Sequence, residues 1–82
     1  MVDMKKLDER FEEAARLVVS QGRASTSYLQ TALGMGFAKS ARVMSQLEAA
    51  GIVGPQDGSK MREVLVSSLQ ELDSIILAYK KG

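Results

Sequence analysis

The stretch "GMGFAKSARVMSQLEAAGIV", residues 34–53, decides how the rest of the chain is interpreted. Two glycines frame its start, a helical segment begins near Phe37, and Gly51 stands where a left-handed helix stop belongs. The predicted buried stripe of this helix consists of Phe37, Ala41, Met44, Leu47 and Ala50. The opposite face carries Ala38, Lys39, Arg42, Ser45, Gln46 and Ala49. The pairing of two cations with small side chains on one face is the first indication of function.

Two further helices are predicted before this stretch. The first has apolar or small residues at the i, i+4, i+7, i+8 and i+11 spacing of an amphipathic helix, and Gly22 ends it. Its stripe is Leu7, Phe11, Ala14, Ala15 and Val18. The second lies within "RASTSYLQTALG", residues 23–34, where Ser25 or Ser27 can cap the N-terminus. Its predicted inward residues are Leu29, Ala32 and Leu33.

A β-hairpin and a fourth helix are predicted after it. The turn-forming "GPQDGSK", residues 54–60, separates an extended run at Ile52 and Val53 from "REVLV", residues 62–66. Ser68 and Glu71 then form a capping box at the start of an amphipathic segment. The sequence therefore predicts a mainly α fold. We expect residues 1–68 to form a winged helix-turn-helix of three helices plus a β-hairpin wing, and residues 69–82 to form an extra C-terminal helix for packing or dimerisation.

Composition excludes several classes of function. The 82 residues include 11 Lys and Arg, 10 Asp and Glu, and neither Cys nor His, so disulfides, the usual zinc sites and a Ser-His-Asp triad are excluded. No phosphate-binding loop of an ATP motor is present. We therefore expect no enzyme activity and no cofactor. Because the N-terminus is charged and no long apolar run occurs, we expect a cytoplasmic chain without a membrane span.

The predicted fold suggests DNA binding. In a winged helix the third helix lies in the major groove, where Arg pairs with guanine O6 and N7. Arg42 is suited to this contact, and Lys39 lies one turn away on the same face. Lys60 and Arg62 on the wing are expected to hold phosphates. The alternative is an ordinary solvated face of a helical bundle, because the net charge is only +1.

The segment "RASTSYLQTALGMGFAKSARVMSQLEAAGIVGPQDGSKMREVLVSS", residues 23–68, closely resembles the gamma domain of FtsK/SpoIIIE-type DNA translocases. The matching motifs include Gly36-Phe37, Ala41-Arg42, "LEAAGIVGP" and the "REVLV" run. The resemblance implies a winged helix that reads short, asymmetric, G-rich chromosomal sequences, orients an ATP-driven motor and, in some members, contacts a Xer-type recombinase. Ala38 stands where Asn is usual and Ser45 where an acid is usual, departures that concern the DNA sequence read and leave the fold unaffected.

The predicted partner is double-stranded DNA, and the predicted DNA-binding residues come from the second helix, the third helix and the wing. They are Arg23, Ser25, Ala38, Lys39, Arg42, Ser45, Lys60 and Arg62. Two alternatives remain open at this point. One is a free-standing dimeric DNA-binding regulator that pairs through the C-terminal helix, and the other is a protein-interaction module for a Xer-type recombinase or a motor.

Overall fold

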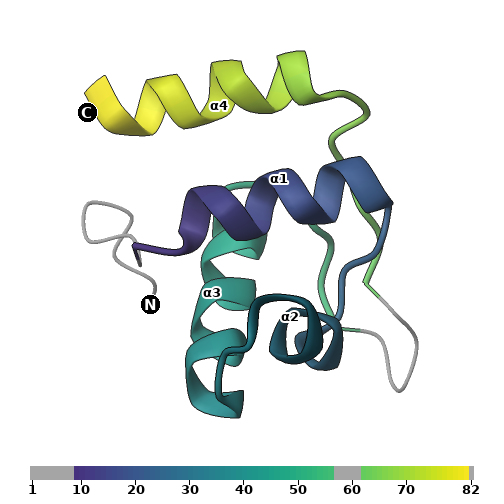
Figure 1. The fold of residues 1–82 in the computed structure, drawn as a ribbon. Helices are drawn as coiled ribbons and strands as arrows, with labels where there is room; N and C mark the ends of the chain where they lie inside the picture. The colour runs from purple at the N-terminus through teal and green to yellow at the C-terminus, as the bar shows by residue number, and fades with distance from the viewer. Residues whose placement is uncertain (1–8, 57–61, 82) are drawn as a thin grey trace.

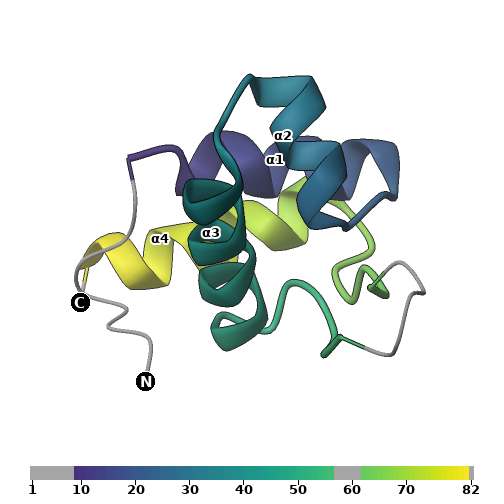
Figure 2. The same cartoon turned by 90° about the horizontal axis from the view of Figure 1, so that it is seen from below.

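The computed structural model describes residues 9–56 and 62–81, and within these ranges the chain forms four helices (Figure 1). They are α1 (Phe11–Gln21), α2 (Thr26–Leu33), α3 (Phe37–Ala49) and α4 (Leu69–Lys81). Helix α1 lies between α4 on one side and α2 and α3 on the other (Figure 1). Seen from below, α3 crosses in front of α1 and α4 (Figure 2). The domain is mainly α and winged-helix-like.

Local chemistry sets the helix ends. The Ser25 hydroxyl caps α2 by accepting a hydrogen bond from the Tyr28 N–H at 3.1 Å. Helix α3 ends in a Schellman motif, in which the N–H of Gly51 binds the Glu48 carbonyl at 3.0 Å and the N–H of Ile52 binds the Leu47 carbonyl at 2.9 Å. Gly51 has a φ of +79°, a left-handed conformation that glycine adopts without a Cβ clash. The predicted stop of α3 is therefore confirmed.

The core collects apolar residues from all four helices and from the segments after α3. Its members are Phe11, Ala14, Ala15, Val18, Ala24, Leu29, Met35, Val43, Met44, Leu47, Ile52, Val53, Val66, Leu72 and Ile76. The predicted stripe of α1 is confirmed from Phe11 onward, and Leu7 lies outside the described residues. In α2, Leu29 is buried and Leu33 half-buried, but Ala32 is exposed, so its predicted inward position is wrong. Ala32 and Leu33 flank the line of Leu29 on opposite sides of this short helix, and the core covers the side of Leu33.

The predicted buried stripe of α3 is partly wrong. Met44 and Leu47 are fully buried, as predicted, but Phe37 is 66% exposed and Gln46, predicted outside, is 3% exposed. The inner face runs instead through Ser40, Val43, Met44, Gln46 and Leu47, while Ala41 and Ala50 are half-buried. The first turn of α3 is the part of this helix farthest from α1 and α4 (Figure 1). Phe37, its first residue, is not covered by the core.

The described parts of the wing meet at one antiparallel bridge, between Val53 and Val64. Beside it, the Gly54 N–H binds the Glu63 carbonyl at 2.8 Å and the Leu65 N–H binds the Ile52 carbonyl at 2.9 Å. The segment before α2 joins the same arrangement, since the Arg62 N–H binds the Ala24 carbonyl at 2.9 Å. Residues 57–61 lie outside the described residues, so the turn of the hairpin, with Lys60, stays a prediction.

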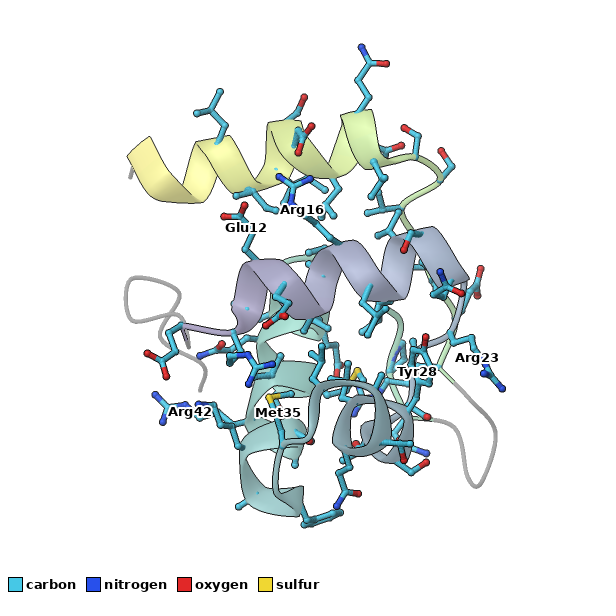
Figure 3. All side chains as sticks on the ribbon, in the orientation of Figure 1. Glu12, Arg16, Arg23, Tyr28, Met35 and Arg42 are labelled. Carbon is cyan, nitrogen blue, oxygen red and sulfur yellow. The ribbon has the colours of Figure 1, made fainter. Side chains whose placement is uncertain are left out.

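Helix α4 runs back along α1. Leu72 and Ile76 are buried in the shared core, and the Ser68 hydroxyl accepts the Glu71 N–H at 3.1 Å, as the capping box predicted. Arg16 of α1 bridges to Asp73 of α4 at 2.7 Å, and the hydrogen bond to Asp73 raises the pKa of the Arg16 guanidinium. Glu12 and Arg16 extend from α1 toward α4 (Figure 3). Part of the apolar stripe of α4 is thus covered by its own chain.

Candidate nucleic-acid interface

The outer face of α3 is a stripe of small side chains with one long cation. Ala38, Arg42, Ser45 and Ala49 are all exposed, and their spacing of four, three and four residues places them on one side of the helix. Arg42 extends away from the other helices (Figure 3). Within residues 9–56 and 62–81, its guanidinium makes no hydrogen bond or ion pair. All five N–H donors of Arg42 are therefore available to a ligand.

The small side chains matter because of the width of the helix. An α-helix with its side chains is about 10–12 Å across, and the major groove of B-DNA is about 12 Å wide. Ala38, Ser45 and Ala49 keep the exposed side of α3 narrow, so the helix can approach base edges closely. Arg42 then becomes the residue that reaches farthest from this stripe. The arrangement suits a helix that enters a groove with one donor-rich contact.

Lys39 lies at the edge of this stripe and is half-buried. Its Nζ is 3.4 Å from Oε1 of Glu9, whose side chain is 82% exposed. Ion pairs between exposed side chains contribute only about 0–1 kcal/mol. The pair with Glu9 therefore does not by itself prevent Lys39 from binding a phosphate.

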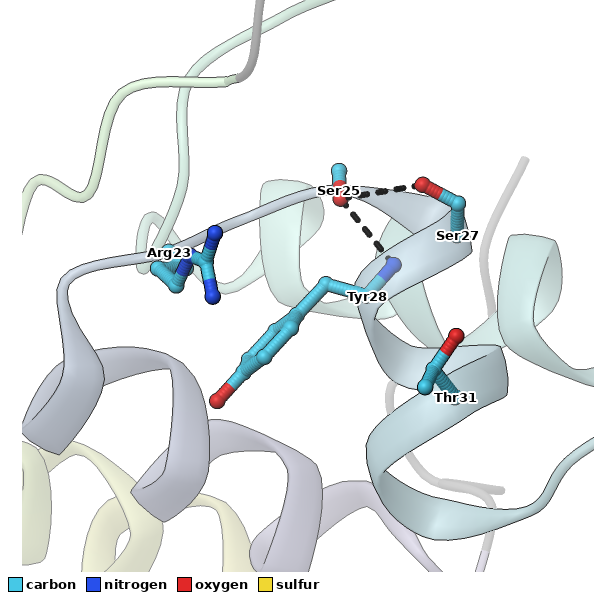
Figure 4. Close-up of a pocket in the computed structure, with 5 residues that line it drawn as sticks. All are labelled: Arg23, Ser25, Ser27, Tyr28 and Thr31. Carbon is cyan, nitrogen blue, oxygen red and sulfur yellow. Dashed lines mark hydrogen bonds between the residues drawn. The ribbon is translucent and has the colours of Figure 1, made fainter.

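A second polar surface lies at the start of α2. Arg23, Ser25, Ser27, Tyr28 and Thr31 line a hollow of about 320 Å³ (Figure 4). The Arg23 guanidinium carbon is 5.1 Å from the centroid of the Tyr28 ring, a cation–π geometry that holds the cation at the rim. The hydroxyls of Ser25 and Ser27 are 3.5 Å apart. A guanidinium and hydroxyls beside a helix N-terminus form an environment suited to a phosphate.

The sequence predicted only part of this hollow. Arg23 and Ser25 were among the expected DNA-binding residues, whereas Ser27, Tyr28 and Thr31 were missed. The spacing of Ser27, Tyr28 and Thr31 is the signal that could have found them. Positions 27 and 31 are one turn apart, and Tyr28 adjoins Ser27. Figure 3 shows Arg23, near the start of α2, and Arg42, on α3, at opposite sides of the domain.

Arg62 is half-buried and contacts other parts of the protein. Its Nη1 lies 2.6 Å from Oε1 of Glu48 in α3 and donates to the Gly54 carbonyl at 3.3 Å. The Arg62 side chain is only 13% exposed, and its buried Nε has no hydrogen-bond partner among the described residues. This guanidinium therefore links the segment after the predicted wing turn to α3, and its expected phosphate contact stays a prediction. Sequence reasoning missed Glu48 as its partner.

Two further observations bound the chemistry of the described residues. No group of three or more acidic side chains in the described ranges is placed to hold a metal ion. No helix in the same part of the chain is both long enough and apolar enough to cross a membrane.

Comparison with known proteins assigns the chain to a family. Residues 5–67 match the Ftsk gamma domain. The DNA translocase FtsK of Chlorobaculum tepidum is 51% identical over 74 residues, which are 90% of this chain and 9% of that protein. The DNA translocases FtsK of Chlamydia muridarum and Corynebacterium efficiens are 43% and 46% identical over 88% and 95% of this chain. The chain spans about 9% of the length of each of these three relatives.

Proposed function

The chain belongs to the FtsK gamma domain family, and from this premise we propose that it binds duplex DNA and reads a short base sequence with α3. The observation that carries the proposal is the exposed stripe of α3, where Arg42 stands without a protein partner in the described structure among small side chains. Because the stripe takes no part in the core, its residues are available for recognition. The guanidinium of Arg42 pairs with O6 and N7 of a guanine in the major groove.

The remaining cations position the protein on the duplex. Lys39 and Arg23 bind phosphates on either side of the groove that α3 enters, and Ser25 adds a hydroxyl at the start of α2. Lys60, which lies outside the described residues, is proposed to hold a phosphate from the wing. These contacts provide affinity without base preference, so specificity rests on α3.

We further propose that the chain is the DNA-reading part of a translocase, because its relatives are much longer proteins of that name. In this role the duplex sequence bound by α3 sets the side from which the motor part approaches. Contact with a Xer-type recombinase, which the family resemblance implies, remains a prediction, and no described surface favours it over DNA.

Selection of bound duplexes from a random pool, followed by competition binding at several salt concentrations, tests the proposal. We expect one preferred site. Arg42→Ala should weaken binding to it by about 1–3 kcal/mol and relax the preference at one base pair. Arg16→Gln is the matched control, because it removes the same charge on the side of α1 that faces α4 (Figure 3). Equally weak binding to all duplexes would reject sequence reading.

A further inference from the structure

Tyr28 is a half-buried aromatic residue of α2 whose ring contacts Arg23. The guanidinium carbon of Arg23 lies over this ring at 5.1 Å from its centroid, and the two side chains lie next to each other in Figure 4. Arg23 is exposed, and within residues 9–56 and 62–81 the ring is the only group with which its guanidinium interacts. No acidic residue lines the hollow that both side chains border. The hollow therefore holds a cation that no carboxylate there neutralises.

The backbone at both ends of this contact is fixed by hydrogen bonds. Ala24 is fully buried, and its carbonyl accepts the Arg62 N–H at 2.9 Å. The Ser25 hydroxyl accepts the Tyr28 N–H at 3.1 Å. A long arginine side chain on such a fixed backbone still has many rotamers, and a ligand that orders it opposes that entropy. A ring against the guanidinium restricts these rotamers before a ligand arrives, so part of the ordering is already complete.

The same guanidinium can contact a ring and a phosphate at once. An arginine stacks on an aromatic ring through its flat face, whereas its N–H donors point outward in the plane of the group and bind phosphate oxygens. The contact with Tyr28 therefore does not by itself occupy the donors of Arg23. We propose that Tyr28 is a positioning residue that orients Arg23 toward a backbone phosphate of duplex DNA. This inference rests on the phosphate contact of Arg23 that forms part of the proposed function.

A double-mutant cycle between Tyr28 and Arg23 tests the positioning role. Binding is measured for the duplex that the unmodified chain selects and for an unrelated duplex of the same length. Tyr28→Leu keeps an apolar side chain but removes the aromatic face, and it should weaken binding of both duplexes about two- to fivefold, the range that corresponds to an exposed cation–π contact. Tyr28→Phe is the matched control, because it keeps the aromatic face and should bind like the unmodified chain. In the Arg23→Ala background, Tyr28→Leu should cause no further loss.

Several results would overturn the inference while base reading by Arg42 still stands. Tighter binding by Tyr28→Leu would mean that the ring holds Arg23 away from DNA. An equal loss with and without Arg23 would assign the ring a purely structural role, and a loss confined to the selected duplex would make Tyr28 a base contact. Unchanged affinity and salt slope in Arg23→Ala would remove the phosphate contact itself.

The proposed sequence reading fails by a different result. Equal affinity of the unmodified chain for all duplexes would reject base reading by α3. Coupling between Tyr28 and Arg23 on such duplexes would still support the positioning role, because a backbone phosphate is present in every sequence. A chain that binds no duplex would overturn both the proposed function and this inference.

Discussion

Breaking the ion pair between Glu48 and Arg62 should weaken DNA binding even though it removes a negative charge from α3. The change is Glu48→Gln, which keeps the size of the side chain and an acceptor oxygen but removes the negative charge that pairs with Arg62 at 2.6 Å. If Arg62 positions the wing, loss of this contact lets the wing move away from α3. If Arg62 instead binds a phosphate, Glu48 competes with DNA, and its removal should strengthen binding. The sign of the effect separates the two roles.

The exposure of Glu48 sets the size of the expected loss of stability. Hydrogen bonds to charged groups contribute about 1.5–3 kcal/mol to stability. The Glu48 side chain is 44% exposed, so water replaces part of what it provides, and we expect a loss below this range, about 1 kcal/mol. For a domain of this size, that lowers the melting temperature by roughly 4–8 °C. The effect on DNA affinity cannot exceed the energy that holds the wing, so binding should fall by no more than about fivefold.

The assay is a thermal melt and a duplex-binding titration of Glu48→Gln, Arg62→Ala and the double variant. Because both residues act through one contact, the double variant should lose little more than either single one. Glu63→Gln is the control, since it removes the same charge from an exposed wing residue next to Arg62. Tighter binding by Glu48→Gln, with a salt slope reduced by about 0.9 in Arg62→Ala, would refute the positioning role and restore the phosphate contact predicted from the sequence.

Four other outcomes are expected. Lys39→Ala and Arg23→Ala should each reduce the slope of log affinity against log salt by about 0.9, without loss of base preference, in titrations at several salt concentrations. Leu72→Ala, at a fully buried site between α4 and α1, should cost about 2–5 kcal/mol in urea unfolding, whereas Leu77→Ala at the exposed side of α4 should change stability by less than about 0.5 kcal/mol. Gly51→Ala should cost about 1–2 kcal/mol in the same experiment, because it forces a left-handed backbone on a residue with a Cβ. Sedimentation of the intact chain should give a monomer, because α1 covers the buried residues of α4, and a concentration-dependent dimer would support the regulator alternative instead.

Local signals predicted the helices and their ends well. Ser25, Gly51 and Ser68 act within one turn of their own position, so the sequence around them determines which backbone groups they bind. The β-hairpin wing was predicted from extended runs on either side of turn-forming residues, and it stays a prediction. The structure describes only one bridge between these runs, at Val53 and Val64.

The rotation of α3 about its axis was harder to predict. Alanine and serine occur on both of its faces, so the apolar pattern fits more than one buried stripe. The prediction included Phe37 in the buried stripe because the residue is apolar, but the core does not reach it. The role of Arg62 depends on a contact 14 positions away in the chain. Net charge and residue spacing in the sequence do not distinguish a cation that is available to bind a phosphate from one that is already paired with Glu48.

The division of α3 into two faces has an evolutionary consequence. Its inner face, which includes Val43, Met44 and Leu47, contributes to the core, and its outer stripe does not. Substitutions at Ala38, Ser45 or Ala49 can therefore introduce new hydrogen-bonding groups while the hydrophobic packing stays intact. Under the proposed function, a lineage can therefore change its DNA target by substitutions at these positions while the core packing is kept. The same property makes these three positions the natural choice for a randomised library aimed at new base preferences.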